Sequence, residues 1–167
     1  MTDLHDVHGP ARPAILTPEE QRAVWFLGAL DRVLVGGAET AGRLAVLEHR
    51  AERGHGSPLH RHDLDDETFF VLEGELRVEV DGRALTAGAG TAAFLPRKVP
   101  HAFVVTSPQV RYLTVSEPAG FDDFVLEVGT PATSDGPPSD EHPPTPAELA
   151  EIARRHNIEI LGPPIAP

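Results

Sequence analysis

Hydrophobic positions from Val24 to Val128 fall in short runs that Gly, Pro and Asp interrupt at close intervals. This spacing is typical of an all-β sandwich or barrel. Strands are expected at Ala23–Leu27, Arg32–Val35, Arg43–His49, Thr68–Leu72, Leu76–Val80, Arg83–Leu85, Thr91–Leu95, Ala102–Val105, Val110–Ser116 and Phe121–Glu127. The clearest pair is Leu76–Leu85, because Asp81-Gly82 suits a tight turn between two alternating strands.

The pattern changes after Gly129. Pro, Ser, Asp and Thr dominate residues 130–144, which we expect to form a linker. Thr145-Pro146-Ala147-Glu148 then predicts a capped helix start, with Leu149, Ile152 and Ala153 on one face of a helix running to about His156. That apolar stripe needs a surface to cover, on this barrel or on a partner subunit. The expected division is a tail at 1–20, a barrel at 21–129, the linker, and a helix and tail at 145–167.

Composition narrows the classes of partner and ligand. The formal net charge is -12, and no basic stretch is present to follow a phosphate backbone, so we expect no nucleic acid partner. No cysteine is present, so a metal would be held by nitrogen and oxygen. Residues 1–13 are polar and no apolar run is long enough to span a bilayer, so we expect a cytoplasmic protein without membrane contact.

The candidate chemistry lies in His60-Arg61-His62 and Glu67. In an extended strand, residues two apart point to the same face, so both imidazoles can serve one site. Glu67 follows at an odd offset, so the acidic segment Asp63–Asp66 is expected to turn or bulge and re-aim it. Imidazole and carboxylate together suit iron, nickel, manganese, cobalt, copper or zinc.

These residues resemble a known family. Gly56-Ser57-Pro58-Leu59-His60-Arg61-His62, then Glu67 and Gly74, resembles the first cupin motif, and Gly90, Pro96 and His101 match the second. The resemblance implies a double-stranded β-helix, or jelly-roll barrel, in which His60, His62, Glu67 and His101 hold one divalent transition metal. It departs at Lys98, where the family has glycine in a tight turn, and at Val105, where it has asparagine.

Alternation along the strands predicts the surroundings of the metal. Phe69 and Val71 should share a side with Glu67, and Phe103 and Val105 should share a side with His101. These four residues are expected to line an apolar substrate pocket. The remaining histidines are expected to be solvated or merely hydrogen-bonded (His5, His8, His49, His142 and His156), or to lie at the pocket rim (His55).

The whole pattern looks like single-domain bacterial cupins related to quercetin 2,3-dioxygenase. That resemblance implies a metal-dependent dioxygenase acting on a small aromatic or enolisable, mostly apolar substrate, with Glu67 as the catalytic proton acceptor. A polyketide cyclase or isomerase using a Lewis-acid metal such as zinc is the first alternative, and a non-catalytic ligand-binding barrel is the second. The family also implies a homodimer.

Overall fold

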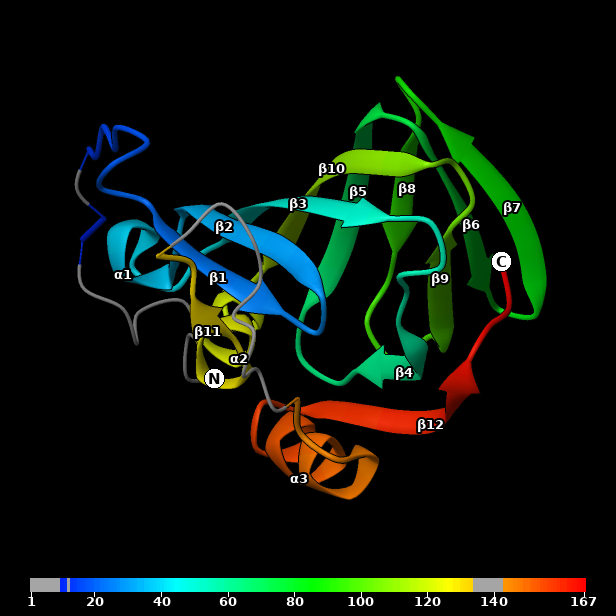
Figure 1. Cartoon of the computed structure of the whole chain (residues 1–167). Helices are drawn as coiled ribbons and strands as arrows, with labels where there is room; N and C mark the ends of the chain where they lie inside the picture. The colour runs from blue at the N-terminus through cyan, green and yellow to red at the C-terminus, as the bar shows by residue number, and fades with distance from the viewer. Residues whose placement is uncertain (1–9, 12, 134–142) are drawn as a thin grey trace.

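A computed structural model describes residues 10–11, 13–133 and 143–167. Within these ranges the chain forms strands and three short helices (Figure 1). The strands are β1 (Arg22–Phe26), β2 (Ala29–Val35), β3 (Ala45–Glu52), β4 (Pro58–His62), β5 (Asp66–Glu73), β6 (Glu75–Val80), β7 (Arg83–Gly88), β8 (Ala92–Leu95), β9 (His101–Val105), β10 (Gln109–Glu117), β11 (Thr130–Pro131) and β12 (Ile158–Pro164). The helices are α1 (Gly37–Thr40), α2 (Phe121–Val128) and α3 (Pro146–Arg155).

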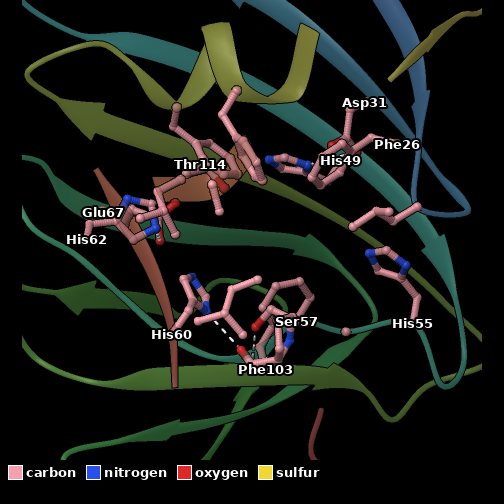
Figure 2. Close-up of a pocket in the computed structure, with 18 of the residues that line it drawn as sticks. Phe26, Asp31, His49, His55, Ser57, His60, His62, Glu67, Phe103 and Thr114 are labelled. Atoms are coloured by element: carbon pink, nitrogen blue, oxygen red, sulfur yellow. Dashed lines mark hydrogen bonds and ion pairs between the residues drawn. The ribbon is translucent and has the colours of Figure 1, made fainter. Parts of the chain in front are cut away.

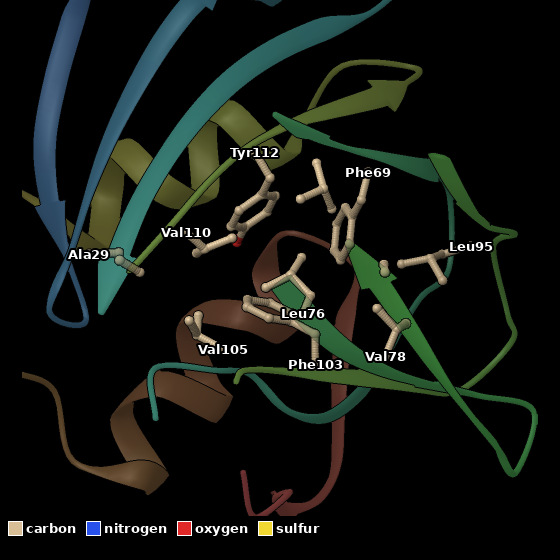
Figure 3. Packing of buried hydrophobic residues seen from close by; sticks show 12 residues of the cluster. Ala29, Phe69, Leu76, Val78, Leu95, Phe103, Val105, Val110 and Tyr112 are labelled. Carbon is tan, nitrogen blue, oxygen red and sulfur yellow. The ribbon is translucent and has the colours of Figure 1, made fainter. Parts of the chain in front are cut away.

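The strands form two antiparallel sheets that face each other, which confirms the all-β barrel (Figure 1). One sheet has the order β11-β1-β2-β3-β10-β5-β8, and the other has the order β12-β4-β9-β6-β7. Alternate side chains of each sheet point inward and meet in one core between them. Figure 3 shows Phe69 and Tyr112 from the first sheet packed against Leu76, Val78 and Phe103 from the second.

The hairpin expected at Leu76–Leu85 is present. β6 and β7 pair in antiparallel register from Glu75↔Gly88 to Val80↔Arg83. Asp81 and Gly82, between them, have φ angles of 50° and 71°. Two successive positive φ angles are the signature of the tight turn whose twist matches that of the strands.

The strand expected at Phe121–Glu127 is wrong, because this segment is the helix α2. Phe124 and Val125 are buried there, and Asp122 and Asp123 lie in the first turn, where the helix dipole favours negative charge. Apolar residues at Phe121, Phe124, Val125 and Val128 follow the helical spacing i, i+3, i+4 and i+7. That spacing, rather than strict alternation, matches the observed structure.

The segment after the linker contributes more than a helix and a tail. Thr145 caps α3 through a reciprocal pair of hydrogen bonds with Glu148, as the sequence predicts. The chain then forms β12, which pairs with β4 in the second sheet (Figure 1). The apolar stripe of α3 packs on Phe124 of α2 and on Ile158 of β12. It therefore covers this chain's own barrel, so it supplies no reason for a homodimer.

No helix among residues 10–11, 13–133 and 143–167 is long and apolar enough to cross a membrane. Half of the expected N-terminal tail, the middle of the linker, and the residues His5, His8 and His142 lie outside the described residues.

Candidate metal centre

Three histidines meet on neighbouring strands of the five-stranded sheet. His60 and His62 both lie on the inner face of β4, as the two-residue spacing predicts, and their side chains are buried. His101, the first residue of β9, is the direct partner of His60 across the sheet. The imidazole centroid of His60 lies 4.4 Å from that of His101 and 5.2 Å from that of His62.

Glu67 reaches the histidines from the opposite sheet. Residues 63–65 bend between β4 and β5, and β5 belongs to the seven-stranded sheet. The expected turn in the acidic segment is therefore present, and it carries the chain from one layer of the barrel to the other. Because the two inner faces look at each other, a residue on β5 can point back toward β4 despite its odd offset. Glu67 is 2% exposed.

The ligand atoms of His60, His62, Glu67 and His101 all lie within 4.8 Å of one another. Oε2 of Glu67 is 3.1 Å from Nε2 of His101 and 3.3 Å from Nε2 of His62. A metal ion bonded at roughly 2.1 Å to each donor holds its donors about 3 to 4 Å apart. The four side chains therefore form a cluster that could hold a metal ion with only small movements.

The outward nitrogens of the three imidazoles are all engaged. Nδ1 of His62 lies 2.8 Å from Oδ2 of buried Asp65, and Nδ1 of His60 and His101 lie 2.9 Å and 3.1 Å from the carbonyl oxygens of Pro58 and Val99. Partners that only accept place the proton on Nδ1 and leave Nε2 with its lone pair free for a metal.

Nε2 of His62 is buried and has no hydrogen-bond partner among the described residues. A buried ring nitrogen that faces other ligand atoms and has no hydrogen-bond partner is what a metal site presents once the imidazole is neutral, so the residues fit a divalent ion. Asp65 was not singled out by sequence reasoning. Three acidic residues lie between His62 and Glu67, and only the bend decides which one points inward at His62.

Protonation of the metal-free cluster follows from burial and charge. Burial, with the neighbouring imidazoles of His101 and His62, lowers the pKa of His60 to about 3. Burial also lowers the pKa of His62, but the Glu67 carboxylate and Asp65 outweigh it and raise that pKa to about 9. Burial raises the pKa of Glu67, and the surrounding imidazoles outweigh it and bring the value down to about 2. Without metal, His62 and Glu67 are thus a buried ion pair near neutral pH.

The cluster borders a cavity of about 70 Å³ (Figure 2). Phe69 and Phe103 are on its wall, as predicted. The placement of Val71 and Val105 on the wall is wrong. Both are buried in the hydrophobic core and are not among the lining residues. They lie two residues further along their strands, where inward side chains pack against each other instead of around a space.

Segments after residue 120 complete the cavity wall, and sequence reasoning missed them. Phe121 and Phe124 come from α2, Leu149 and Ala153 from α3, and Ile158 and Ile160 from β12. Phe121 is in direct contact with the cluster, because its ring centroid lies 5.7 Å from that of His62. The helical spacing of α2 and the alternation of Ile158 and Ile160 were the available signals.

The remaining histidines divide differently from the prediction. His55 lines the cavity, in agreement with a rim position, and burial lowers its pKa. His156 is the C-cap of α3, is 18% exposed, does not line the cavity, and has Nε2 2.6 Å from Oε2 of Glu127. His49 is not solvated. It is 4% exposed, lines the same cavity, and has Nδ1 2.9 Å from Oδ1 of Asp31.

Lys98 adopts the backbone conformation that the family's glycine would favour. Its φ angle is 67°, in the left-handed region that costs a residue with a side chain about 1 kcal/mol. Its backbone N–H donates a 2.6 Å hydrogen bond to the carbonyl oxygen of His62, which ties the turn before β9 to β4. The side chain is exposed and does not line the cavity.

Comparisons with known proteins agree with the fold. Residues 47–116 match the model of the cupin domain. Quercetin 2,3-dioxygenase of Bacillus subtilis (strain 168) is 24% identical over 131 residues, which are 78% of this chain and 39% of that protein. This chain thus spans about two fifths of the length of the curated relative it matches.

Two solved structures have similar folds. KdgF from Halomonas sp. superposes with a TM-score of 0.59 at 18% identity, over 67% of this chain and 99% of that one. The polyketide cyclase RemF from Streptomyces resistomycificus superposes with a TM-score of 0.53 at 24% identity, over 64% and 80%. The cupin-domain match over residues 47–116, the two-sheet barrel and the clustered motif residues together support a cupin-superfamily protein.

Proposed function

We propose that this chain is a metal-dependent cupin enzyme, a dioxygenase of the quercetinase type that acts on a small aromatic or enolisable, mostly apolar substrate. The observation that carries the proposal is the meeting of His60, His62, Glu67 and His101 beside an apolar cavity. A metal held there by three imidazoles and one carboxylate keeps open positions that face the space where a substrate fits. The distant likeness to quercetin 2,3-dioxygenase points to the same class of reaction.

The imidazoles and the carboxylate have different tasks in this proposal. A bound iron, nickel, manganese, cobalt or copper ion would supply coordination of the substrate oxygen and electron transfer to dioxygen. The three imidazoles are fixed in orientation by Asp65 and by two backbone carbonyls. Glu67 is a buried carboxylate on the cavity wall, so it would be placed to accept the proton of an incoming hydroxyl group.

The cavity wall favours a flat and mostly apolar molecule. Aromatic side chains surround the space, among them Phe69, Phe103 and Phe121. Such walls stack on aromatic rings and exclude bulk water from the carboxylate and the imidazoles. A hydroxyl next to a carbonyl on the substrate would give the metal two oxygens.

Metal analysis tests the proposal directly. The protein is purified without an affinity tag and without added metal, in parallel with a His60→Ala, His62→Ala double variant. His156→Ala serves as the matched control, because this histidine is bonded to Glu127 away from the cavity. We expect about one redox-active ion per chain in the wild type and the control, and none in the double variant.

Oxygen uptake with flavonols and catechols then decides between reaction classes. Consumption of dioxygen that depends on substrate and on the bound metal supports the dioxygenase. Zinc without oxygen uptake would replace it with a cyclase or isomerase in which the ion polarises a carbonyl. Equal metal content in the wild type and the double variant would contradict the site assignment and leave a ligand-binding barrel.

A further inference from the structure

A second pair of buried ionisable side chains lies in the same cavity, on strands that carry no metal ligand. Asp31 of β2 and His49 of β3 are direct partners across the seven-stranded sheet. Their side chains are 1% and 4% exposed, and Oδ1 of Asp31 lies 2.9 Å from Nδ1 of His49. The His49 ring stacks on Tyr112 of β10, with centroids 4.6 Å apart and an interplanar angle of 18°.

This arrangement leaves one imidazole nitrogen of a cavity-lining residue without a partner. A carboxylate can only accept, so the nitrogen beside Asp31 carries the proton, and Nε2 of His49 becomes an acceptor. Nε2 is buried without a hydrogen-bond partner among the described residues. The Asp31 contact has the distance of an ion pair but not the geometry of a hydrogen bond, so Oδ1 is also without an aligned partner.

Such a pair is costly if its only task is to fill the core. A buried polar atom without a partner destabilises a protein, whereas apolar side chains of similar size would pack there without that loss. Several neighbouring buried side chains are apolar or aromatic, among them Val110 and Tyr112 in Figure 3, whereas Thr114 is a buried polar residue on the wall of the same cavity. A polar acceptor facing a ligand space is instead the means by which a site selects molecules that carry a donor.

The pair and the metal-ligand cluster belong to one cavity but to different parts of its wall. Figure 2 shows His49 and Asp31 apart from Glu67, His62 and His60, with Thr114 labelled between the two groups. Phe121 contacts both groups, since its ring centroid lies 6.3 Å from that of His49 and 5.7 Å from that of His62. The cavity therefore has two separate polar groups on its wall, and the Phe121 ring lies beside both of them.

We propose that His49, held by Asp31, is a specificity-determining acceptor for a hydroxyl or N–H group on the substrate. The substrate is then an aromatic molecule with two polar ends: an oxygen that binds the metal and a donor group that binds Nε2 of His49. The contact between the substrate oxygen and the metal rests on the proposed function, whereas the contact between the substrate donor and His49 does not. Asp31 is a positioning residue, because it acts on the ligand only through the imidazole.

Matched flavonols test the donor end in metal-loaded protein. 3-Hydroxyflavone presents only the metal-binding oxygens, and its derivatives with one added hydroxyl at position 7 or 4′ also present a donor. Fluorescence titration of the wild type should show at least one derivative binding about tenfold more tightly than the parent, the worth of one buried hydrogen bond. No preference for either derivative would overturn the proposal.

The variants assign that preference to His49. His49→Asn keeps a donor for Asp31 but has no atom where Nε2 stands, so the preference should fall to about onefold while the parent flavonol binds as before. Asp31→Asn should reduce the preference partly, and His156→Asn, outside the cavity wall, should leave it unchanged. A preference that survives in His49→Asn refutes the assignment. Metal content and thermal unfolding of each variant show that it is folded and loaded.

Phenol and toluene test the pair without the metal. If no flavonol binds the metal-loaded protein, the proposed function is contradicted. The role of His49 as an acceptor is then tested in the metal-free protein. Phenol should bind more tightly than toluene and shift the Nε2 resonance of isotope-labelled His49. Equal binding of the two, or a phenol preference that remains in His49→Asn, would contradict the proposal.

Discussion

Replacing Asp65 should weaken metal binding although Asp65 touches no metal. Its Oδ2 lies 2.8 Å from Nδ1 of His62, and both side chains are buried. The contact fixes the imidazole ring and keeps its proton on Nδ1, away from the ligand cluster. Loss of such an outer contact typically weakens metal binding 10- to 100-fold, which is about 1.4 to 2.7 kcal/mol.

Two substitutions separate the hydrogen bond from the charge. In Asp65→Asn the amide oxygen can still accept from Nδ1, so we expect a loss near tenfold. In Asp65→Leu the Nδ1–H group is buried without a partner, so the loss should approach 100-fold. Asp63→Asn is the matched control, because Asp63 lies in the same bend but pairs with Arg61 at the surface.

Competition with a chromophoric chelator measures the zinc or cobalt affinity of each variant at one pH and one salt concentration. Thermal unfolding of the metal-free proteins shows whether a variant has lost its fold instead of its ion. An affinity for Asp65→Leu equal to that of Asp63→Asn would refute the reasoning, because the outer contact would then have no effect on the centre.

Three further outcomes are expected. Apparent metal affinity should rise about tenfold per pH unit toward pH 9. The reason is that His62, with its pKa raised to about 9, must lose one proton to bind the metal, whereas Glu67 is already ionised. Chelator competition at several pH values measures this dependence, and a flat dependence would contradict the prediction. Leu76→Ala should lower the free energy of unfolding by about 2 to 5 kcal/mol in urea, because Leu76 is fully buried, whereas Leu85→Ala on the neighbouring strand, where Leu85 is 57% exposed, should change it by less than about 0.5 kcal/mol. Lys98→Gly should raise the free energy of unfolding by up to about 1 kcal/mol, since Lys98 holds a positive φ angle; an unchanged or lower midpoint would show that the left-handed turn carries no strain.

The fold was largely predictable because its strands alternate on a two-residue period. The hairpin at Asp81-Gly82 shows this best, since both its turn residues and its flanking pattern indicate one structure. The α2 segment was misread because its aromatic and β-branched residues favour strands, while the helical spacing of Phe121, Phe124 and Val125 was overlooked. β12 was read as a tail because Gly162 and two prolines follow its alternating residues.

The candidate ligands were predictable for a different reason. His60 and His62 share a strand, and a family resemblance supplied His101 and the role of Glu67. Residues that act through a contact between two strands were not predictable, because the register of the pairing is not evident from either strand alone. His49 sits on the buried face of β3, but only the pairing of β3 with β2 reveals the carboxylate of Asp31 beside it.

The position of β12 bears on when the centre can form during synthesis. β4, which carries two of the candidate ligands, lies between β9 and β12 and meets β9 at the pair His60↔His101. Its other side pairs with residues made almost a hundred positions later, at Ile158–Pro164. Until β12 has been synthesised, β4 is an edge strand with unpaired backbone groups. Such edges can pair with other chains. The centre is thus expected to close late in biogenesis, so metal insertion would follow translation of β12 rather than accompany emergence of the barrel.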